Sequence, residues 1–142
     1  MNTKTCCKVA LVIIFICMSA SLSACQASQM REYYATESNY VTAFGTVAFF
    51  SMNEAEKALY IDFLTTTPTF DDTCFKIVGN NYDLVLERGI GDFLQNGSQI
   101  EFITAPRYFG DGYVMPIVSM SADGETILAF DEGYENFLEW LN

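Results

Sequence analysis

The chain has 142 residues, the length of one domain, with 7 basic and 18 acidic residues and no histidine. Its net charge of −11 repels phosphate backbones and excludes nucleic acid as a natural partner. The lack of histidine removes the usual general base, the serine and cysteine dyads that depend on it, and a common zinc and copper ligand. The sequence therefore predicts a protein that is not an enzyme and has no cofactor.

The first 24 residues differ in composition from the rest of the chain. Lys4 and Lys8 precede an apolar run at residues 9–18, and small residues follow as far as Ala24. This order of basic, apolar and small residues is that of a secretory signal. Ten helical residues reach about 15 Å, half of a hydrocarbon core, so we expect residues 1–24 to be removed as a signal peptide.

A short motif ends this segment, and it consists of Leu22, Ser23, Ala24 and Cys25. It resembles the bacterial lipobox, in which a Leu and two small residues precede a Cys, and the chain is similar to small uncharacterised lipoproteins of Gram-positive bacteria. The resemblance implies that the Cys25 sulfur takes a diacylglyceryl group and that a peptidase cuts before Cys25. We therefore expect lipid to anchor the protein to the cell membrane, on its extracytoplasmic face. Ordinary secretion with an unmodified Cys25 is the alternative.

The mature chain is more acidic than the precursor. Removal of residues 1–24 takes away two basic residues and no acidic one, which leaves five basic against 18 acidic residues and a net charge of −13. No basic patch remains to support membrane binding, so the lipid has to supply the anchor. Only Cys25 and Cys74 remain, which excludes a disulfide scaffold. Cys74 lies in an apolar run and is predicted to be a buried structural thiol.

Residues 26–39 are polar with little periodicity and are predicted to form a tether between the lipid and a domain at residues 40–142. The pattern of apolar residues and turn residues then predicts one helix among strands. In chain order we expect strands at 40–50, 58–64 and 74–78, a helix at 83–94, strands at 99–104, 113–120 and 126–130, and a last helix from Asp131.

Several details of these elements are specific. Gly45 interrupts the first strand and indicates a bulge or a sharp bend. Asn80 and Asn81 are predicted to cap the internal helix, and Asp131 the last helix. The apolar residues expected to share a face are Leu59, Ile61 and Phe63 on the second strand, Leu86, Ile90, Phe93 and Leu94 on the internal helix, and Tyr134, Phe137, Leu138 and Leu141 on the last helix.

Three strands, a helix and two strands, followed by a short strand and a helix, resemble the OB-fold. That fold is a five-stranded Greek-key barrel with its helix between strands three and four. The resemblance covers residues 40–120 and rests on element order rather than on a signature motif. It predicts a mainly β protein, although an SH3-like barrel, or an α+β sheet with one covering helix, fits much of the same pattern.

The OB-like order also predicts where a ligand binds, because the groove of that fold crosses strands two and three between two loops. Here the loops are residues 51–54, which include Asn53, and residues 107–113. The second loop holds Arg107, Tyr108, Phe109, Asp111 and Tyr113. Aromatic rings stack on flat apolar faces while Arg and Asp orient a ligand by hydrogen bonds. We expect the two loops to form one contact surface; the alternative is a hairpin whose aromatic rings fold back onto the core.

The sequence thus predicts a lipid-anchored extracytoplasmic binding or interaction module for a peptide, a glycan or a partner protein. A cell-envelope hydrolase that uses Asp71, Asp72 and Asp111 is an alternative, and a purely structural envelope protein is another. The same carboxylates are a candidate oxygen site for Ca²⁺, although their spacing matches no complete calcium loop.

Overall fold

The computed structural model describes residues 25–107, 109 and 115–142, so the predicted signal peptide lies outside the described residues. The chain divides into two compact units, residues 1–33 and 34–142. In the first unit residues 25–33 are helical, whereas the sequence predicted an irregular tether there. The segment is rich in Ala, Gln, Met, Arg and Glu, all good helix formers, and this propensity outweighs the absence of an apolar stripe.

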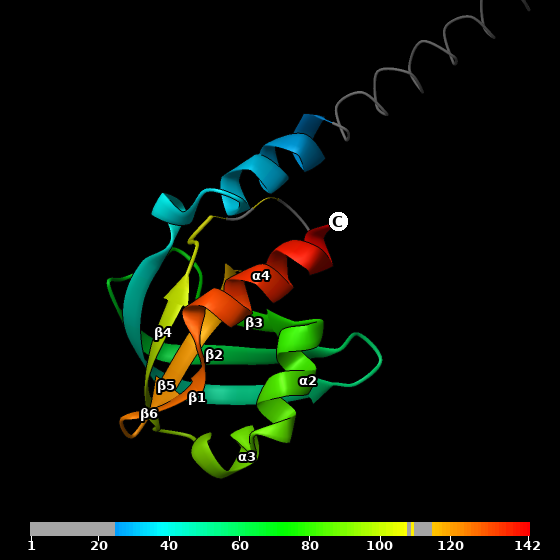
Figure 1. Cartoon of the computed structure of the whole chain (residues 1–142). Coiled ribbons are helices and arrows are strands. Elements are labelled where there is room, and N and C mark those ends of the chain that lie inside the picture. The colour runs from blue at the N-terminus through cyan, green and yellow to red at the C-terminus, as the bar shows by residue number, and fades with distance from the viewer. Residues whose placement is uncertain (1–24, 108, 110–114) are drawn as a thin grey trace, which may run out of the picture. The chain divides into compact units, whose positions relative to one another are not determined.

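A six-stranded sheet forms most of the second unit, and the protein is mainly β as predicted (Figure 1). Its strands are β1 (Val41–Asn53), β2 (Ala58–Thr67), β3 (Cys74–Val78), β4 (Gln99–Thr104), β5 (Met115–Ala122) and β6 (Glu125–Leu128). Their order is β3-β2-β1-β4-β5-β6, and these neighbours are antiparallel. An additional parallel pairing joins β3 to β5 through Phe75 and Met115.

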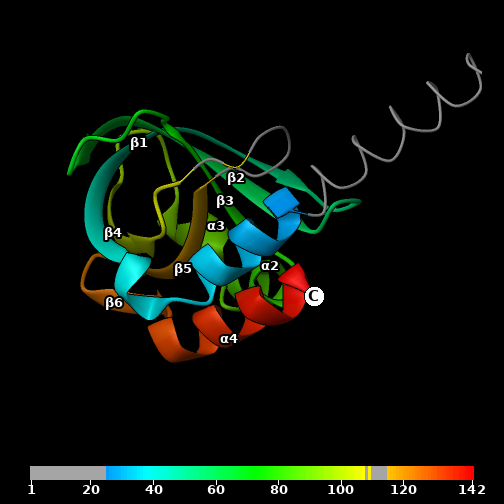
Figure 2. The same ribbon diagram turned by 90° about the horizontal axis from the view of Figure 1, so that it is seen from above.

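The helices of this unit are η1 (Glu37–Asn39), α2 (Asn80–Glu87), α3 (Ile90–Phe93) and α4 (Phe130–Leu141). Helices α2 and α4 contact each other, and α4 also contacts β5 (Figure 1). Seen from above, β1 and β2 lie on one side of the domain and α4 on the other (Figure 2). Within the part of the chain that the structure describes, no helix is long and apolar enough to cross a membrane.

The internal helix differs from the prediction. It is split into α2 and α3, because Gly89 takes a left-handed conformation with φ of 74° between them. Asn80 and Asn81 lie inside α2, which follows Gly79 without a side-chain cap, so both were wrongly predicted as caps. Ile90 and Leu94 are buried as expected and Phe93 is half-buried against the core, whereas Leu86 is exposed. The buried face also includes Asn81, Tyr82 and Val85.

The last helix begins earlier than predicted. Asp131 lies in its first turn, and Ala129 occupies the capping position, so the predicted Asp131 cap is wrong. Phe137 and Leu141 are buried on the expected face, whereas Tyr134 and Leu138 are only half-buried. Gly133 is the third buried residue of this helix, because the helix packs closely against the sheet there.

Strand β1 bends just after Gly45. Its pairing with β2 shifts register between Thr46 and Val47 and again between Val47 and Phe49. A Cβ atom on Gly45 would lie 2.4 Å from the ring of Phe63, so this glycine permits the close approach of β2 at the bend. The strand also continues to Asn53, so residues 51–53, predicted as a loop, belong to β1.

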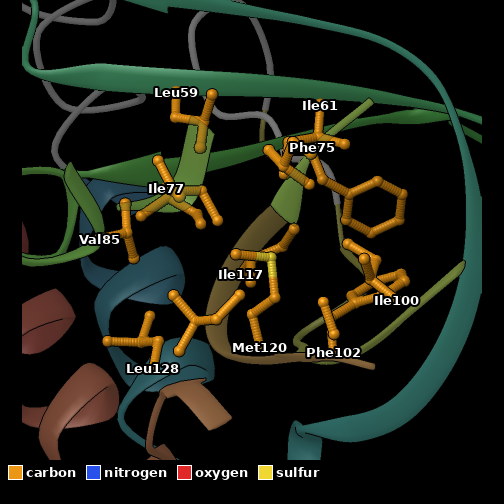
Figure 3. Close-up of a cluster of buried hydrophobic side chains, with 14 of the residues drawn as sticks. Leu59, Ile61, Phe75, Ile77, Val85, Ile100, Phe102, Ile117, Met120 and Leu128 are labelled. Carbon is orange, nitrogen blue, oxygen red and sulfur yellow. The ribbon is translucent and has the colours of Figure 1, made fainter. Parts of the chain in front are cut away.

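The core lies between the sheet and the helices α2 and α3. It includes Leu59, Ile61, Phe75, Ile77, Val85, Ile100, Phe102, Ile117, Met120 and Leu128 (Figure 3). The inward face predicted for β2 is confirmed, since Leu59, Ile61 and Phe63 are all buried. Phe63 stacks on Phe102 with ring centroids 4.7 Å apart. Burial of each large apolar side chain contributes about 1.5–3 kcal/mol, which makes this cluster the main source of stability.

Candidate functional site

The first of the two loops predicted to bind a ligand, residues 51–54, stabilises the turn between β1 and β2. Residues 51–53 are strand residues, and the turn between β1 and β2 comprises residues 54–57. The Asn53 side-chain oxygen accepts a hydrogen bond from the Glu56 backbone N–H at 3.2 Å. Local hydrogen bonds of this kind are typical of Asn beside a turn. Asn53 therefore orders the hairpin.

The second predicted loop is described only at Arg107 and Phe109; Tyr108, Asp111 and Tyr113 lie outside the described residues. The Phe109 side chain is 8% exposed, and its ring centroid lies 5.5 Å from that of Tyr34. The guanidinium carbon of Arg107 lies 4.6 Å from the Phe109 ring centroid. Phe109 thus packs inward, as in the alternative in which the aromatic rings fold back onto the core.

The described ends of the two predicted loops are not brought together. The carbonyl of Lys57, in the β1–β2 turn, accepts a hydrogen bond from Gly79, just after the carboxyl end of β3. Met115, where the other connection ends, pairs with Phe75 near the amino end of β3. Residues 75 and 79 are separated by about 13 Å of extended chain. The two described ends therefore lie at opposite ends of β3, and because residues 108 and 110–114 lie outside the described residues, the single contact surface stays a prediction.

A different surface lies on the outer side of β1, β2 and β3, and we call it the outer face. Cross-strand pairing aligns Phe49, Asp62 and Cys74 in one row and Ser51, Tyr60 and Lys76 in the next. Leu64 belongs to the same side of β2 as Tyr60 and Asp62. These seven residues come from three strands and define the outer face.

Two large apolar side chains are exposed on the outer face. Phe49 is 57% exposed and Leu64 is 71% exposed. The pairing passes from Thr46–Thr65 to Val47–Phe63, so Leu64 is the extra residue of a bulge and has no partner across the strand pair. Asp62 is opposite Phe49, and Leu64 is two residues further along β2, so the two apolar side chains are diagonal neighbours.

Sequence reasoning missed both residues, although one signal for Leu64 was present. The alternation that turns Leu59, Ile61 and Phe63 inward places Leu64 on the polar side of its strand, where an apolar residue is unexpected. The sequence did not indicate that Phe49 is exposed. Two register shifts, between Thr46 and Val47 and between Val47 and Phe49, change which residues of β1 face outward.

Polar contacts order the neighbouring part of the outer face. The Tyr60 hydroxyl donates a hydrogen bond to Glu56 Oε2 at 2.6 Å. This hydrogen bond, together with partial burial and the charge of Glu56, raises the pKa of Tyr60 to about 12. The Lys76 ammonium lies 4.9 Å from the Tyr60 ring centroid, within reach of a cation–π contact. Tyr60 is thus held from two sides beside the exposed apolar pair.

Cys74 is half-buried on the outer face rather than fully buried as predicted. Burial raises the pKa of its thiol from 9.0 to about 11, and the charge of Asp62 and a hydrogen bond to Asp62 add to the effect. The thiol is therefore protonated at neutral pH. Because the thiolate is the nucleophile, this environment suits a structural cysteine.

The raised pKa of Cys74 predicts a loss of stability at alkaline pH. Because the unfolded thiol ionises near pH 9 and the folded thiol near pH 11, the stabilising contribution is complete below pH 9 and is lost as the pH rises to 11. Urea unfolding of the wild type and Cys74→Ser should show a free-energy difference that changes across this window. A difference that stays constant from pH 8 to pH 11 would contradict the shift.

Asp71 and Asp72 line a hollow of about 220 Å³ at the amino end of β3, together with Thr69, Phe70, Pro106 and Met115. Asp72 Oδ1 accepts a hydrogen bond from the Cys74 backbone N–H at 3.0 Å, so this carboxylate orders the start of the strand. Across the described ranges no cluster of three or more His, Cys, Asp or Glu residues is arranged to hold a metal ion. Asp111 lies outside those ranges.

Comparison of the chain with protein-family models, with curated proteins and with solved structures found no match. Its function therefore has to be inferred from its own sequence and geometry.

Proposed function

We propose that the mature protein is a lipoprotein held at the extracytoplasmic face of the membrane by lipid on Cys25, and that its outer face binds a partner protein. The proposed anchor is supported by the order of basic, apolar and small residues before Cys25 and by the lipobox-like Leu22, Ser23 and Ala24. The anchor would confine the domain to the cell envelope, so the partner would be an envelope protein.

We further propose that strands β1 to β5 form an OB-like barrel. Support comes from a circuit of pairings, in which β1 pairs with β2 and β4, β2 with β3, β4 with β5, and β3 with β5. Residues 41–46 of β1 pair with β4 and residues 44–53 with β2, which is possible because the strand bends after Gly45. Helices α2 and α3 lie between β3 and β4 in the chain, the position of the helix in an OB-fold.

The exposed pair of Phe49 and Leu64 carries the proposed binding role. Single exposed apolar residues are common on protein surfaces, but neighbouring ones on one sheet face mark a contact site. Because the two side chains are 57% and 71% exposed, burial of the remaining area of each against a partner would contribute about 1–2 kcal/mol. Tyr60 and Lys76 lie in the adjacent row and supply a polar rim, which interfaces place around an apolar centre.

The charge of the domain restricts the partner. The mature chain carries a net charge of −13, and Asp62 lies directly beside Phe49 on the outer face. An acidic partner surface would be repelled, while basic side chains around an apolar patch would match both features. The outer face is therefore suited to a partner whose contact surface is apolar at its centre and neutral or basic at its edge.

Site-specific cross-linking tests this role. With the photoreactive residue p-benzoylphenylalanine at position 64, illumination of intact cells should yield one discrete cross-linked species. Position 86 is the matched control, because Leu86 is another exposed leucine but lies on α2, 36% exposed. Phe49→Ser, introduced beside the label at 64, should abolish the cross-linked species. The same pattern of products from both positions, or none from either, would contradict the proposal.

A further inference from the structure

A second hollow, of about 270 Å³, lies between the start of α2 and the last turns of α4. Gly79 and Asn80 line it on one side, and Asn136, Glu139 and Trp140 on the other. None of these lining residues belongs to the seven that define the outer face. It contains the only tryptophan of the chain.

Trp140 is a fixed and accessible aromatic surface. Its side chain is 40% exposed, and its ring stacks on Phe137 with centroids 5.9 Å apart and planes 18° apart. The indole also lies against the backbone of Gly79, since a Cβ atom there would come within 2.7 Å of Trp140 Cδ1. Held by Phe137 and Gly79, the ring would lose little conformational freedom on binding a ligand.

Polar groups beside the indole have hydrogen-bonding capacity left. The Asn136 amide donates to Asn81 Oδ1 at 3.0 Å, and the buried Asn81 amide donates to the Gly133 carbonyl at 2.7 Å. This chain of contacts orients Asn136 and leaves its own side-chain oxygen for another donor. Among the described residues, the side chains of Asn80 and Glu139 make no hydrogen bond or ion pair, so both can contact a ligand.

We propose that this hollow binds one pyranose unit of a neutral glycan of gluco configuration. In such a sugar the hydroxyl groups are equatorial, so the C–H groups form a flat face that can stack on the Trp140 indole. The ring hydroxyls can donate to Glu139 and to the Asn136 oxygen, and they can accept from the Asn80 amide. The Glu139 carboxylate disfavours an acidic sugar, because like charges repel.

The size of the hollow agrees with a single sugar ring. Sites for drug-sized ligands measure roughly 300–1,000 Å³. The hollow, at about 270 Å³, falls just below that range. A longer glycan would therefore place one ring on Trp140 and extend over the surface, and its affinity would be modest because only one ring is held.

Calorimetry tests the proposal with two defined probes, cellotetraose and chitotetraose. The full chain is kept in a zwitterionic detergent, since a detergent with a sugar headgroup would compete. Saturable binding of at least one probe is expected in the wild type. Trp140 is the sole indole, so its emission should move to shorter wavelength as the sugar displaces water. Absence of saturable heat with both probes would overturn the proposal. A response to tetramethylammonium ion but to neither sugar would also overturn it, because that ion has no sugar ring and would bind the exposed indole as a cation.

Substitutions of single residues test whether the sugar binds in this hollow. Trp140→Ala should abolish binding, but it also removes the contact with Phe137, so Glu139→Ala and Asn80→Ala are the decisive changes at exposed side chains. Each should weaken binding about tenfold, the equivalent of about 1.4 kcal/mol.

Glu135→Ala, also exposed on α4 but outside the hollow, should bind as the wild type does. Wild-type affinity in Glu139→Ala and Asn80→Ala would rule the site out. Leu64→Ser should leave sugar binding unchanged, which keeps this result independent of the proposed partner surface.

Discussion

Substitution of Gly133 by alanine is expected to lower the free energy of unfolding by about 3 kcal/mol, the upper end for an overpacked site. A Cβ atom at this position would lie 2.0 Å from the Val118 carbonyl oxygen and 3.1 Å from Leu128 Cγ. The oxygen belongs to the backbone of β5 and cannot rotate away. Helix α4 would have to retreat from the sheet, which would also strain the hydrogen bond from Asn81 to the Gly133 carbonyl at 2.7 Å.

Gly91→Ala is the matched control, because it adds the same methyl group to another helical glycine. Gly91 lies in α3, and apart from its chain neighbours and the backbone of its own helix no atom lies within 4 Å of the position that a Cβ atom would take there. Alanine exceeds glycine in helix propensity, so this change should raise the free energy of unfolding by up to about 1 kcal/mol. Urea unfolding of both variants measures the contrast. Equal stability of the two would show that α4 does not pack on β5 as described.

The strands were more predictable than the helices, because burial on one side of a sheet imposes a period of two on the sequence. The alternation in β2 and the apolar runs of β3 and β4 located these strands, and the structure places β3 at residues 74–78 and β4 at 99–104 as expected. The extension of β1 to Asn53 was not visible, since residues 51–53 are polar or exposed and their strand pairing depends on the partner strand.

The errors around α2 have a different cause. Asn80 and Asn81 match the composition of a helix cap, which is a local property. The partner of Asn81 is the carbonyl of Gly133, 52 residues further along the chain. An amide that joins two helices cannot be distinguished from a capping amide without the tertiary contact. The split into α2 and α3 was visible only as the low helix propensity of Gly89 and Gly91.

The candidate site depends on register, which the sequence specifies least. The predicted loops could be identified as segments rich in turn residues and aromatic residues. The positions of their described ends follow from which residues of β3 pair with β5 and which contact the β1–β2 turn. The exposure of Phe49 and Leu64 follows from two register shifts. Bulges of this kind alter the outward face of a strand without a distinctive composition.

Cys25→Ser is expected to abolish the membrane anchoring that we propose. Two acyl chains suffice for stable attachment, whereas a single chain gives an association constant of only about 10⁴ M⁻¹. The mature chain offers no electrostatic substitute, since its net charge is −13. In detergent phase partitioning the wild type should enter the detergent phase, and Cys25→Ser should either remain in the aqueous phase or persist as an unprocessed precursor. Cys74→Ser removes the other cysteine of the mature chain and should partition as the wild type does.

Mass spectrometry of tryptic peptides separates these outcomes. In the processed wild type the first peptide should comprise residues 25–31, because Arg31 is the first basic residue after Cys25, and it should carry the mass of a diacylglyceryl group. An unprocessed Cys25→Ser chain should instead yield residues 9–31 as one peptide, since Lys8 is the preceding cleavage site. A wild-type peptide that begins at residue 25 without added mass, together with equal partitioning of both proteins, would refute the lipid anchor. It would favour ordinary secretion, and it would leave the Phe49–Leu64 surface to be tested on a soluble protein.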